Sequence, residues 1–189
     1  MTLLSMTALA FAPKKPIAFA SKMRERQPVY RRARQEDYDP ILRVLEFANF
    51  HRIPSAEMPS FAIARCFVAE LDGVIVGAAG FTLMNDGRGK TTLMAVDPEC
   101  RRSGIGRKLQ ELRMREMSRL GCRSVVTNAD LRDTIAWYKK HFGYREIGTL
   151  AKLHEFGDPD VDHWTTLETD LAPWSEEPSG NPTVLNARR

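Results

Sequence analysis

Paired cysteines, repeats and a long apolar run are all missing from this 189-residue sequence. The three cysteines, Cys66, Cys100 and Cys122, are odd in number and show no Cys-x-x-Cys spacing, which excludes a disulfide framework and a zinc knuckle. No fixed period indicates a repeat protein, and the apolar run 3–12 is too short to span a bilayer. With 43% apolar and 28% charged residues, the composition predicts a soluble globular protein. We expect it to be cytoplasmic, in a reducing compartment and without a membrane contact.

Positive charge is concentrated near the N-terminus. Residues 1–34 contain eight Lys and Arg and one Glu, whereas the whole chain has a formal net charge of +4. Such an arm could bind nucleic acid, but arms of this composition are usually solvated extensions. The apolar run 3–12 is not preceded by the cation that a secretory signal requires. Met23 is a second possible translation start, so whether residues 1–22 belong to the mature protein stays open. We expect a flexible basic extension over 1–27, one domain over 28–172 and a disordered tail over 173–189.

Apolar periodicity predicts strands and helices in an α+β order. Helices are expected from about Pro40 to Ala48, over 105–120 and up to His141, the last capped by Asp130 or Asp133. Strands are expected at 29–33, 66–71, 74–84, 91–96, 124–128, 144–150 and 164–171. Since a helix separates strand 124–128 from strand 91–96, the crossover should make those two parallel. The sequence therefore predicts a mixed, mostly antiparallel sheet of six to seven strands.

The segment 96–109 joins the end of a strand to the start of a helix through a turn with two glycines, Gly104 and Gly106. Glycine lets the backbone approach a ligand closely, and the amides of a helix's first turn favour a phosphate or diphosphate. A Walker loop is excluded because Lys108 is not adjacent to Gly106 and precedes Leu109. A dinucleotide fingerprint would need glycine where Leu109 stands.

The run instead has the spacing Arg-x-x-Gly-x-Gly, formed by Arg101, Gly104 and Gly106, directly after Ala-Val-Asp-Pro. Together with Ile-Ala-Trp-Tyr-Lys-Lys-His-Phe-Gly-Tyr at 135–144, it strongly resembles the GNAT N-acyltransferase superfamily over about residues 29–171. The resemblance implies helices on both faces of the sheet and a parallel pair of strands that splay apart. It also implies an acetyl-CoA-dependent N-acetyltransferase. Such an enzyme moves an acetyl or similar acyl group to an amine of a small molecule or peptide, by direct attack in a ternary complex.

The same resemblance places acetyl-CoA on two segments. Backbone amides from 101 to 106 would hold the pyrophosphate, strand 91–96 would bond the pantetheine arm, and an amide near Met94 or Ala95 would face the thioester oxygen. Cys100, inside the turn, is expected to be a spacer and not a nucleophile. The expected cofactor contacts are Met94, Ala95, Val96, Arg101, Arg102, Ser103, Gly104, Ile105, Gly106, Arg107 and Asn128.

Tyr138 resembles the tyrosine that protonates the leaving thiolate in the family, although Gly143 follows it by five residues where four are common. It shares a helical face with Ile135 and Phe142, so a role in core packing is the alternative. The strand 91–96 has no acid, whereas many relatives have a Glu there. The base that deprotonates the amine is therefore open between a water relay and three side chains: His51, Glu70 and Asp130.

Two other functions stay open. The absence of an acid in strand 91–96 and the five-residue spacing from Tyr138 to Gly143 are compatible with a catalytically inactive acyl-CoA-binding regulatory module. The basic N-terminal arm is compatible with a nucleic-acid binder. No metal is expected, because the cluster His154, Asp158, Asp160, Asp162 and His163 lacks the glycine and terminal Glu of a calcium loop. The acceptor, the acyl length and the formation of a homodimer cannot be read from the sequence.

Overall fold

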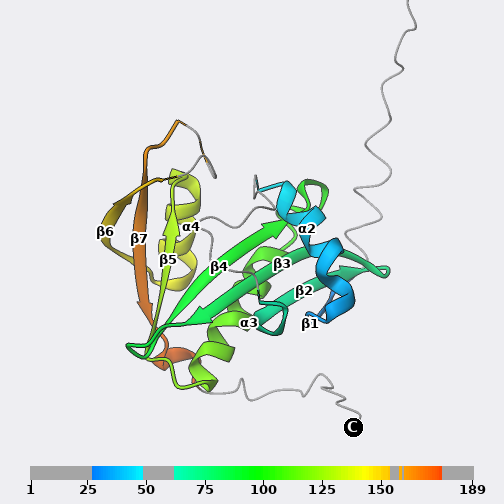
Figure 1. Ribbon diagram of the computed structural model, residues 1–189, viewed down its shortest axis with the longest axis horizontal. Coiled ribbons are helices and arrows are strands. Elements are labelled where there is room, and N and C mark those ends of the chain that lie inside the picture. Colours follow the sequence, from blue (N-terminus) through cyan, green and yellow to red (C-terminus); the bar gives the residue numbers. More distant parts are fainter. Residues whose placement is uncertain (1–26, 49–61, 154–157, 159, 176–189) are drawn as a thin grey trace, which may run out of the picture.

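The computed structural model describes residues 27–48, 62–153, 158 and 160–175. Their strands form one seven-stranded sheet in the order β1-β2-β3-β4-β5-β7-β6, and only β4 and β5 are parallel neighbours. The predicted mixed, mostly antiparallel sheet is confirmed (Figure 1). The strands are β1 (Val29–Arg32), β2 (Cys66–Leu71), β3 (Val74–Leu83), β4 (Arg88–Val96), β5 (Ser124–Ala129), β6 (Arg145–Ala151) and β7 (His163–Asp170).

Helices cover both faces of the sheet, as expected (Figure 1). On one face, α2 (Tyr38–Glu46) buries Ile41, Val44 and Leu45 in a core cluster with β2, β3 and β4. On the other face, α3 (Ile105–Arg119) and α4 (Arg132–Phe142) share a second cluster with β2, β3 and β5. In the described residues, no helix is both long and apolar enough to cross a membrane. Four short 3-10 turns complete the fold: η1 (Gln35–Asp37), η2 (Ile63–Arg65), η3 (Pro98–Cys100) and η4 (Ala172–Trp174).

Three sequence predictions differ from the structure in detail. β4 begins at Arg88, three residues before the predicted start, because Gly89 and Lys90 pair with both β3 and β5. The predicted aspartate cap of α4 was wrong, since Leu131 is the N-cap and no side chain caps the helix. Beyond the expected domain end at 172, the ring of Trp174 packs 6.0 Å from that of Phe142, so the packed chain extends at least that far.

A β-bulge lies at the centre of the sheet. On β3, Gly80 alone faces Thr92 and Leu93 of β4. A Cβ at Gly80 would lie 2.7 Å from Thr92 Oγ1, so this position needs glycine. A bulge bends its strand and increases the local twist. This one comes two residues after Lys90, the last β4 residue that pairs with β5, and so coincides with the point where β4 leaves β5.

Replacing Gly80 by alanine should destabilise the protein by about 1–3 kcal/mol, the usual cost of forcing an extra carbon into a packed site. Urea unfolding would measure this change. Gly148→Ala is the matched control, because Gly148 also lies beside a bulge but a Cβ there meets nothing within 4 Å. Equal stability of the Gly80→Ala variant and the wild type would show that the sheet tolerates a regular register at this point.

Candidate active site

The turn between β4 and α3 is fixed by local hydrogen bonds. Asp97 Oδ1 accepts a hydrogen bond from Glu99 N at 2.9 Å, and Asp97 N donates to Val76 O on β3 at 2.8 Å. The backbone then reverses sharply, because Arg102 and Gly104 have positive φ angles of 60° and 88°. A side chain is strained at such an angle, which explains the glycine at position 104. The turn therefore presents residues 101–104 to solvent directly ahead of the helix.

Backbone amides at the start of α3 point into this turn. The first hydrogen bond of the helix runs from Lys108 N to Gly104 O at 3.0 Å, so the amides of 105–107 have no acceptor within the helix, as in any α-helix. The helix dipole adds a positive potential at the same end. Ile105 is buried and can contribute only its backbone. This set of amides suits a phosphate or diphosphate.

Guanidinium groups surround the same amides. Arg101 and Arg102 are exposed on the turn, and Arg107 follows on the first turn of α3, where its Nε lies 3.2 Å from Glu111 Oε1. Arginine side chains form charge-assisted hydrogen bonds with phosphate oxygens. The structure therefore brings seven predicted cofactor contacts together in one turn, and their donors fit a diphosphate: Arg101, Arg102, Ser103, Gly104, Ile105, Gly106 and Arg107.

Cys100 lies in this turn but is buried. Burial raises the pKa of its thiol to about 11, helped by the nearby negative charges of Asp97 and Glu99. A thiol with this pKa stays protonated near neutral pH and is a poor nucleophile. The geometry therefore agrees with a spacer role.

β4 and β5 separate after a short parallel contact. The two strands pair at Arg88–Ser124, Gly89–Val125 and Lys90–Val126, and the hydroxyls of Thr91 and Thr127 are hydrogen-bonded one step further on. Past that point, among the described residues, no β5 residue pairs with β4. An extended ligand can hydrogen-bond to an unpaired strand edge as an added strand would. Three predicted contacts lie on this stretch of β4, namely Met94, Ala95 and Val96.

Asn128 lies on the β5 side of this divergence. Its Oδ1 accepts a hydrogen bond from Thr166 Oγ1 on β7 at 3.1 Å, and the two residues are register partners. This contact holds the carboxamide across the β5–β7 pair. Its amide nitrogen is the end that could donate to a ligand.

Tyr138 lies on the buried face of α4 and is 5% exposed. Its Oη accepts a hydrogen bond from Arg113 Nη2 at 3.0 Å, and its ring lies 5.0 Å from that of Tyr144, edge to face. The next residue, Lys139, is exposed and pairs with Glu146. Sequence reasoning missed Arg113, although it follows the apolar residue Leu109 by four positions and therefore lies on the same helical face.

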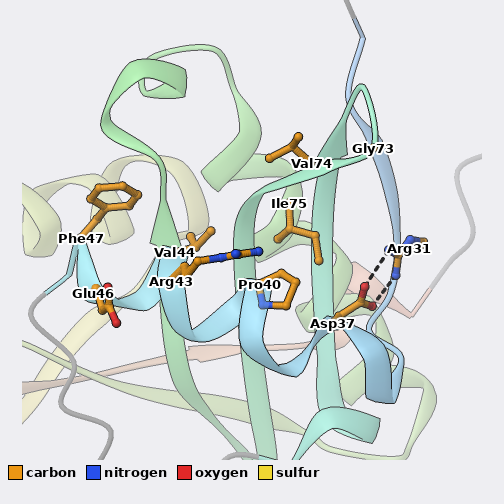
Figure 2. A pocket seen from close by; sticks show the side chains of 10 residues that line it. All are labelled: Arg31, Asp37, Pro40, Arg43, Val44, Glu46, Phe47, Gly73, Val74 and Ile75. Atoms are coloured by element: carbon orange, nitrogen blue, oxygen red, sulfur yellow. Dashed lines mark hydrogen bonds and ion pairs between the residues drawn. The ribbon is translucent and has the colours of Figure 1, made fainter.

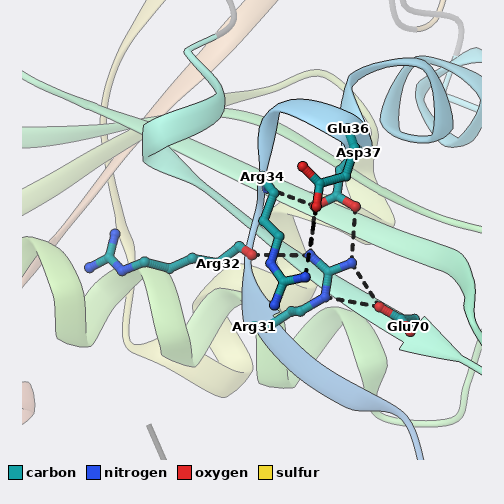
Figure 3. Close-up of polar contacts among 6 residues, drawn as sticks. All are labelled: Arg31, Arg32, Arg34, Glu36, Asp37 and Glu70. Carbon is teal, nitrogen blue, oxygen red and sulfur yellow. Dashed lines mark hydrogen bonds and ion pairs between the residues drawn. The ribbon is translucent and has the colours of Figure 1, made fainter. Parts of the chain in front are cut away.

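Glu70, a candidate base, is part of an ion-pair cluster that anchors β1 (Figure 3). Arg31 Nε donates to Glu70 Oε2 at 2.9 Å, and its two terminal nitrogens bind both carboxylate oxygens of Asp37 at 2.6 and 2.9 Å. The hydrogen bond from Arg31 holds the pKa of Asp37 below its ordinary value. Glu70 is therefore committed to a structural contact on β2, two strands from β4.

Asp130, a second candidate base, is also engaged. Its Oδ2 accepts hydrogen bonds from Lys152 Nζ at 2.8 Å and from Asp158 N at 2.6 Å. The side chains of Asp130 and Lys152 are only 9% and 7% exposed. This pair links the β5–α4 turn to the segment between β6 and β7. The third candidate, His51, lies outside the described residues, as does His154 of the acidic cluster; in that cluster Asp162 pairs with His163.

Replacing Asp130 by asparagine should destabilise the protein by about 3 kcal/mol, because removing one partner leaves a buried charge uncompensated. Urea unfolding would measure the loss. Glu146→Gln, which breaks the exposed pair with Lys139, should cost less than about 1 kcal/mol. A stable Asp130→Asn variant whose activity no longer depends on pH would instead identify Asp130 as the base.

A depression of about 570 Å³ lies elsewhere, between α2 and the β2–β3 hairpin (Figure 2). Arg31 and Asp37, on its wall, already bind each other. It shares no residue with the 101–107 turn or with the divergence of β4 from β5, so we do not include it in the candidate site. Its lining residues are Arg31, Asp37, Pro40, Arg43, Val44, Glu46, Phe47, Gly73, Val74 and Ile75.

Comparison with known sequences shows the family of this protein. The sequence model of the acetyltransferase (GNAT) family matches residues 26–144. This match spans more than half of the chain, and the protein belongs to the GNAT acetyltransferase family. Among curated proteins, none matches the sequence.

Solved structures share the fold at low sequence identity. Ard1 from Thermoplasma volcanium has a TM-score of 0.64 and 18% identity, over 76% of this chain and 97% of its own. The ribosomal-protein-S18-alanine N-acetyltransferase from Escherichia coli has a TM-score of 0.62 and 17% identity, over 77% and 94%. Arabidopsis thaliana Naa50, solved with the bisubstrate analogue CoA-Ac-MVNAL, has a TM-score of 0.61 and 19% identity, over 76% and 98%. The GNAT-like architecture predicted from the sequence is thereby confirmed.

Proposed function

We propose that the chain is an acetyl-CoA-dependent N-acetyltransferase that moves an acetyl or similar acyl group to an amine of a small molecule or peptide. Its family membership supports acyl transfer. The observation that carries the proposal is the divergence of β4 from β5, which opens beside the amides and arginines of the 101–107 turn. The three thiols among the described residues are buried and free, which suits a reducing compartment such as the cytoplasm.

In this proposal the donor lies along the two segments identified above. The 101–107 turn binds the diphosphate through backbone amides, with Arg101, Arg102 and Arg107 close to the phosphates. The unpaired edge of β4 from Met94 to Val96 binds the pantetheine arm, and Asn128 contributes from the β5 side. The N–H donors of the turn match the phosphate oxygens of acyl-CoA. The unpaired edge of β4 matches the amide groups of its pantetheine arm.

The reaction is a direct attack of the amine on the thioester in a ternary complex. A backbone amide near Met94 or Ala95 stabilises the negative charge that develops on the carbonyl oxygen, and binding both substrates side by side supplies much of the remaining acceleration. The amine must lose a proton, since a lysine-like amine has a pKa near ~10.4. Glu70 and Asp130 are held in ion pairs, which favours a water relay or a group outside the described residues. Tyr138 protonates the departing sulfur.

The acceptor is proposed only as a class. The Arabidopsis Naa50 structure contains the bisubstrate analogue CoA-Ac-MVNAL, and the N-acetylglutamate synthase structure from Neisseria gonorrhoeae contains coenzyme A and N-acetyl-glutamate. These neighbours share the fold at 18–19% identity. They support an amine acceptor of peptide or amino-acid type.

Two measurements test the proposal together. Calorimetry should show that acetyl-CoA binds to the protein. A thiol-release assay with a panel of amines and peptides should show turnover faster than the background rate in buffer alone. Tight binding without turnover across the panel would favour the inactive regulatory module. No binding of acetyl-CoA or coenzyme A would refute the site altogether. Salt-sensitive binding of nucleic acid, lost on removing residues 1–27, would favour the third function.

A further inference from the structure

Arg113 is a buried arginine that contacts two residues of the candidate site, Met94 and Tyr138. It lies on α3 and is 1% exposed. An arginine side chain has five N–H donors and stays charged at any physiological pH. The donors of Arg113 reach two main-chain oxygens, a carboxamide, a hydroxyl and a thioether. The contacts are Gly80 O at 3.1 Å, Leu93 O at 3.0 Å, Gln110 Oε1 at 2.5 Å, Tyr138 Oη at 3.0 Å and Met94 Sδ at 3.8 Å.

None of these acceptors is negatively charged. The ion pairs of the described residues do not include Arg113. The titratable groups that face it are Tyr138 from α4, Tyr144 ahead of β6 and Cys66 from β2. Burial raises the pKa of Tyr144, and that of Cys66 to about 12, so neither provides a counter-charge near neutral pH. A buried cation without a counter-ion is costly to maintain.

The contacts of Arg113 span the divergence between β4 and β5. Leu93 and Met94 lie on β4, just past the point where it leaves β5, and Tyr138 lies on α4, the helix that follows β5. The bulge opposite Gly80 orients two carbonyls toward the guanidinium, one from each strand. The positive charge is thus located beside the stretch of β4 that carries the proposed thioester contacts.

The hydrogen-bond direction at Tyr138 is also set. Because a guanidinium can only donate, the Tyr138 oxygen is the acceptor in this contact. In the described part of the chain, the Tyr138 hydroxyl donates no hydrogen bond to a protein group. The proton of Tyr138 is therefore directed away from Arg113.

We propose that Arg113 is a positioning residue for the leaving group, which fixes the Tyr138 hydroxyl as a proton donor and stabilises the sulfur anion of coenzyme A. This inference rests on the proposed function. The amine nitrogen bonds to the thioester carbon, the carbon–sulfur bond breaks, and its electron pair goes to sulfur. The sulfur takes the Tyr138 proton, and the phenolate beside Arg113 is reprotonated from water, which also receives the proton of the amine.

The pH dependence of coenzyme A binding tests this directly. Calorimetry would compare coenzyme A with desulfo-coenzyme A, in which hydrogen replaces the thiol, between pH 6.5 and 9.5. The ratio of their affinities cancels ionisation of the phosphates and of the protein. If the site stabilises the thiolate, the pKa of the bound thiol lies below its free value of ~8.5, and this ratio of affinities rises with pH. Over the range from pH 6.5 to 9.5 the rise is about eightfold when the pKa is lowered by one unit.

Three variants separate the charge of Arg113 from its packing. Arg113→Met should abolish the rise of the ratio. It should also lower kcat about 10- to 100-fold, the lower end of a lost proton-transfer contribution or less because Tyr138 itself remains, with KM for acetyl-CoA changed less than about threefold. Arg113→Lys keeps a positive charge and should retain part of the rise, while Arg119→Met, on the exposed face of the same helix, should behave as the wild type. If Arg113→Met does not fold, the test is the pH dependence of the affinity ratio in the wild type and in Arg113→Lys.

A flat ratio in the wild type, or an undiminished rise in a folded Arg113→Met variant, overturns the proposal. Both results leave binding of coenzyme A, and so the proposed function, intact. If the wild type binds neither coenzyme A nor its desulfo analogue, the proposed function fails first and the role of Arg113 falls with it.

Discussion

Replacing Gly104 by glutamate should weaken acetyl-CoA binding at least ~100-fold, which corresponds to about 2.7 kcal/mol. The new carboxylate would stand among the amides and arginines of the 101–107 turn, where it repels the diphosphate and competes for its donors. The backbone adds to the effect, because a φ of 88° at this position is strained for any side chain. Calorimetric titration with acetyl-CoA would measure the loss.

Gly121→Glu is the matched control for this variant. Gly121 ends the same helix with a φ of 87°, and neither glycine has an atom within 4 Å of the position of an added Cβ. The two substitutions therefore introduce the same charge and similar backbone strain at opposite ends of α3. We expect Gly121→Glu to bind acetyl-CoA within about threefold of the wild type, since screened charges this far apart interact weakly. Equal losses in both variants would point to a general defect in folding and would contradict the anion site.

Replacing Tyr138 by phenylalanine should lower kcat about 10- to 100-fold while the affinity for acetyl-CoA changes little. The variant removes the proton donor for the sulfur, and general acid catalysis contributes a factor of about this size or more. Binding of the donor depends on the 101–107 turn and on β4, neither of which needs the hydroxyl. Steady-state kinetics with a responsive amine, together with calorimetry, would separate the two effects.

Tyr144→Phe removes a neighbouring hydroxyl from the same cluster. Tyr144 Oη accepts a hydrogen bond from Gln110 at 3.0 Å, as Tyr138 Oη does from Arg113. Each change leaves one buried donor without its acceptor and should cost a similar ~1–3 kcal/mol in stability. Only Tyr138→Phe is expected to slow turnover. If both variants turn over at the wild-type rate, Tyr138 is a packing residue, and the spacing of five residues to Gly143 explains its inward orientation.

Local signals in the sequence predicted the elements accurately. The Asp-Gly pair at 72–73, between strands 66–71 and 74–84, has positive φ at both positions, 52° and 78°, as the type I′ turn that this pair favours requires. Gly121 ends α3 in the left-handed region. Strand boundaries agree closely except at β4, whose first residues pair with β5, a strand more than thirty residues further along the chain. A contact of that kind leaves no local signal.

Polar side chains were harder to place than apolar ones. The sequence analysis gave Arg113 no role, and its burial is explained by the bulge opposite Gly80, where Gly80 and Leu93 supply carbonyl acceptors. The burial of this one cation depends on the register of β3 against β4, which periodicity cannot reveal. Asp130 was predicted as a helix cap or a base, and its partner Lys152 stands 22 residues away.

The sequence alone determined the order of strands and helices, the mixed sheet, and the turn whose glycines and arginines suit a diphosphate. The elements and the turn depend on residues close together in the chain, through turn geometry, alternation of apolar residues or helix termini. The mixed sheet follows from the helix that separates strands 91–96 and 124–128, which requires a parallel crossover. The tertiary structure alone decided where β4 leaves β5, that Glu70 and Asp130 are bound in ion pairs, and that a buried cation faces Tyr138. These features depend on strand register and on burial. Both involve residues that are far apart in the sequence, and both are defined only once the chain has packed.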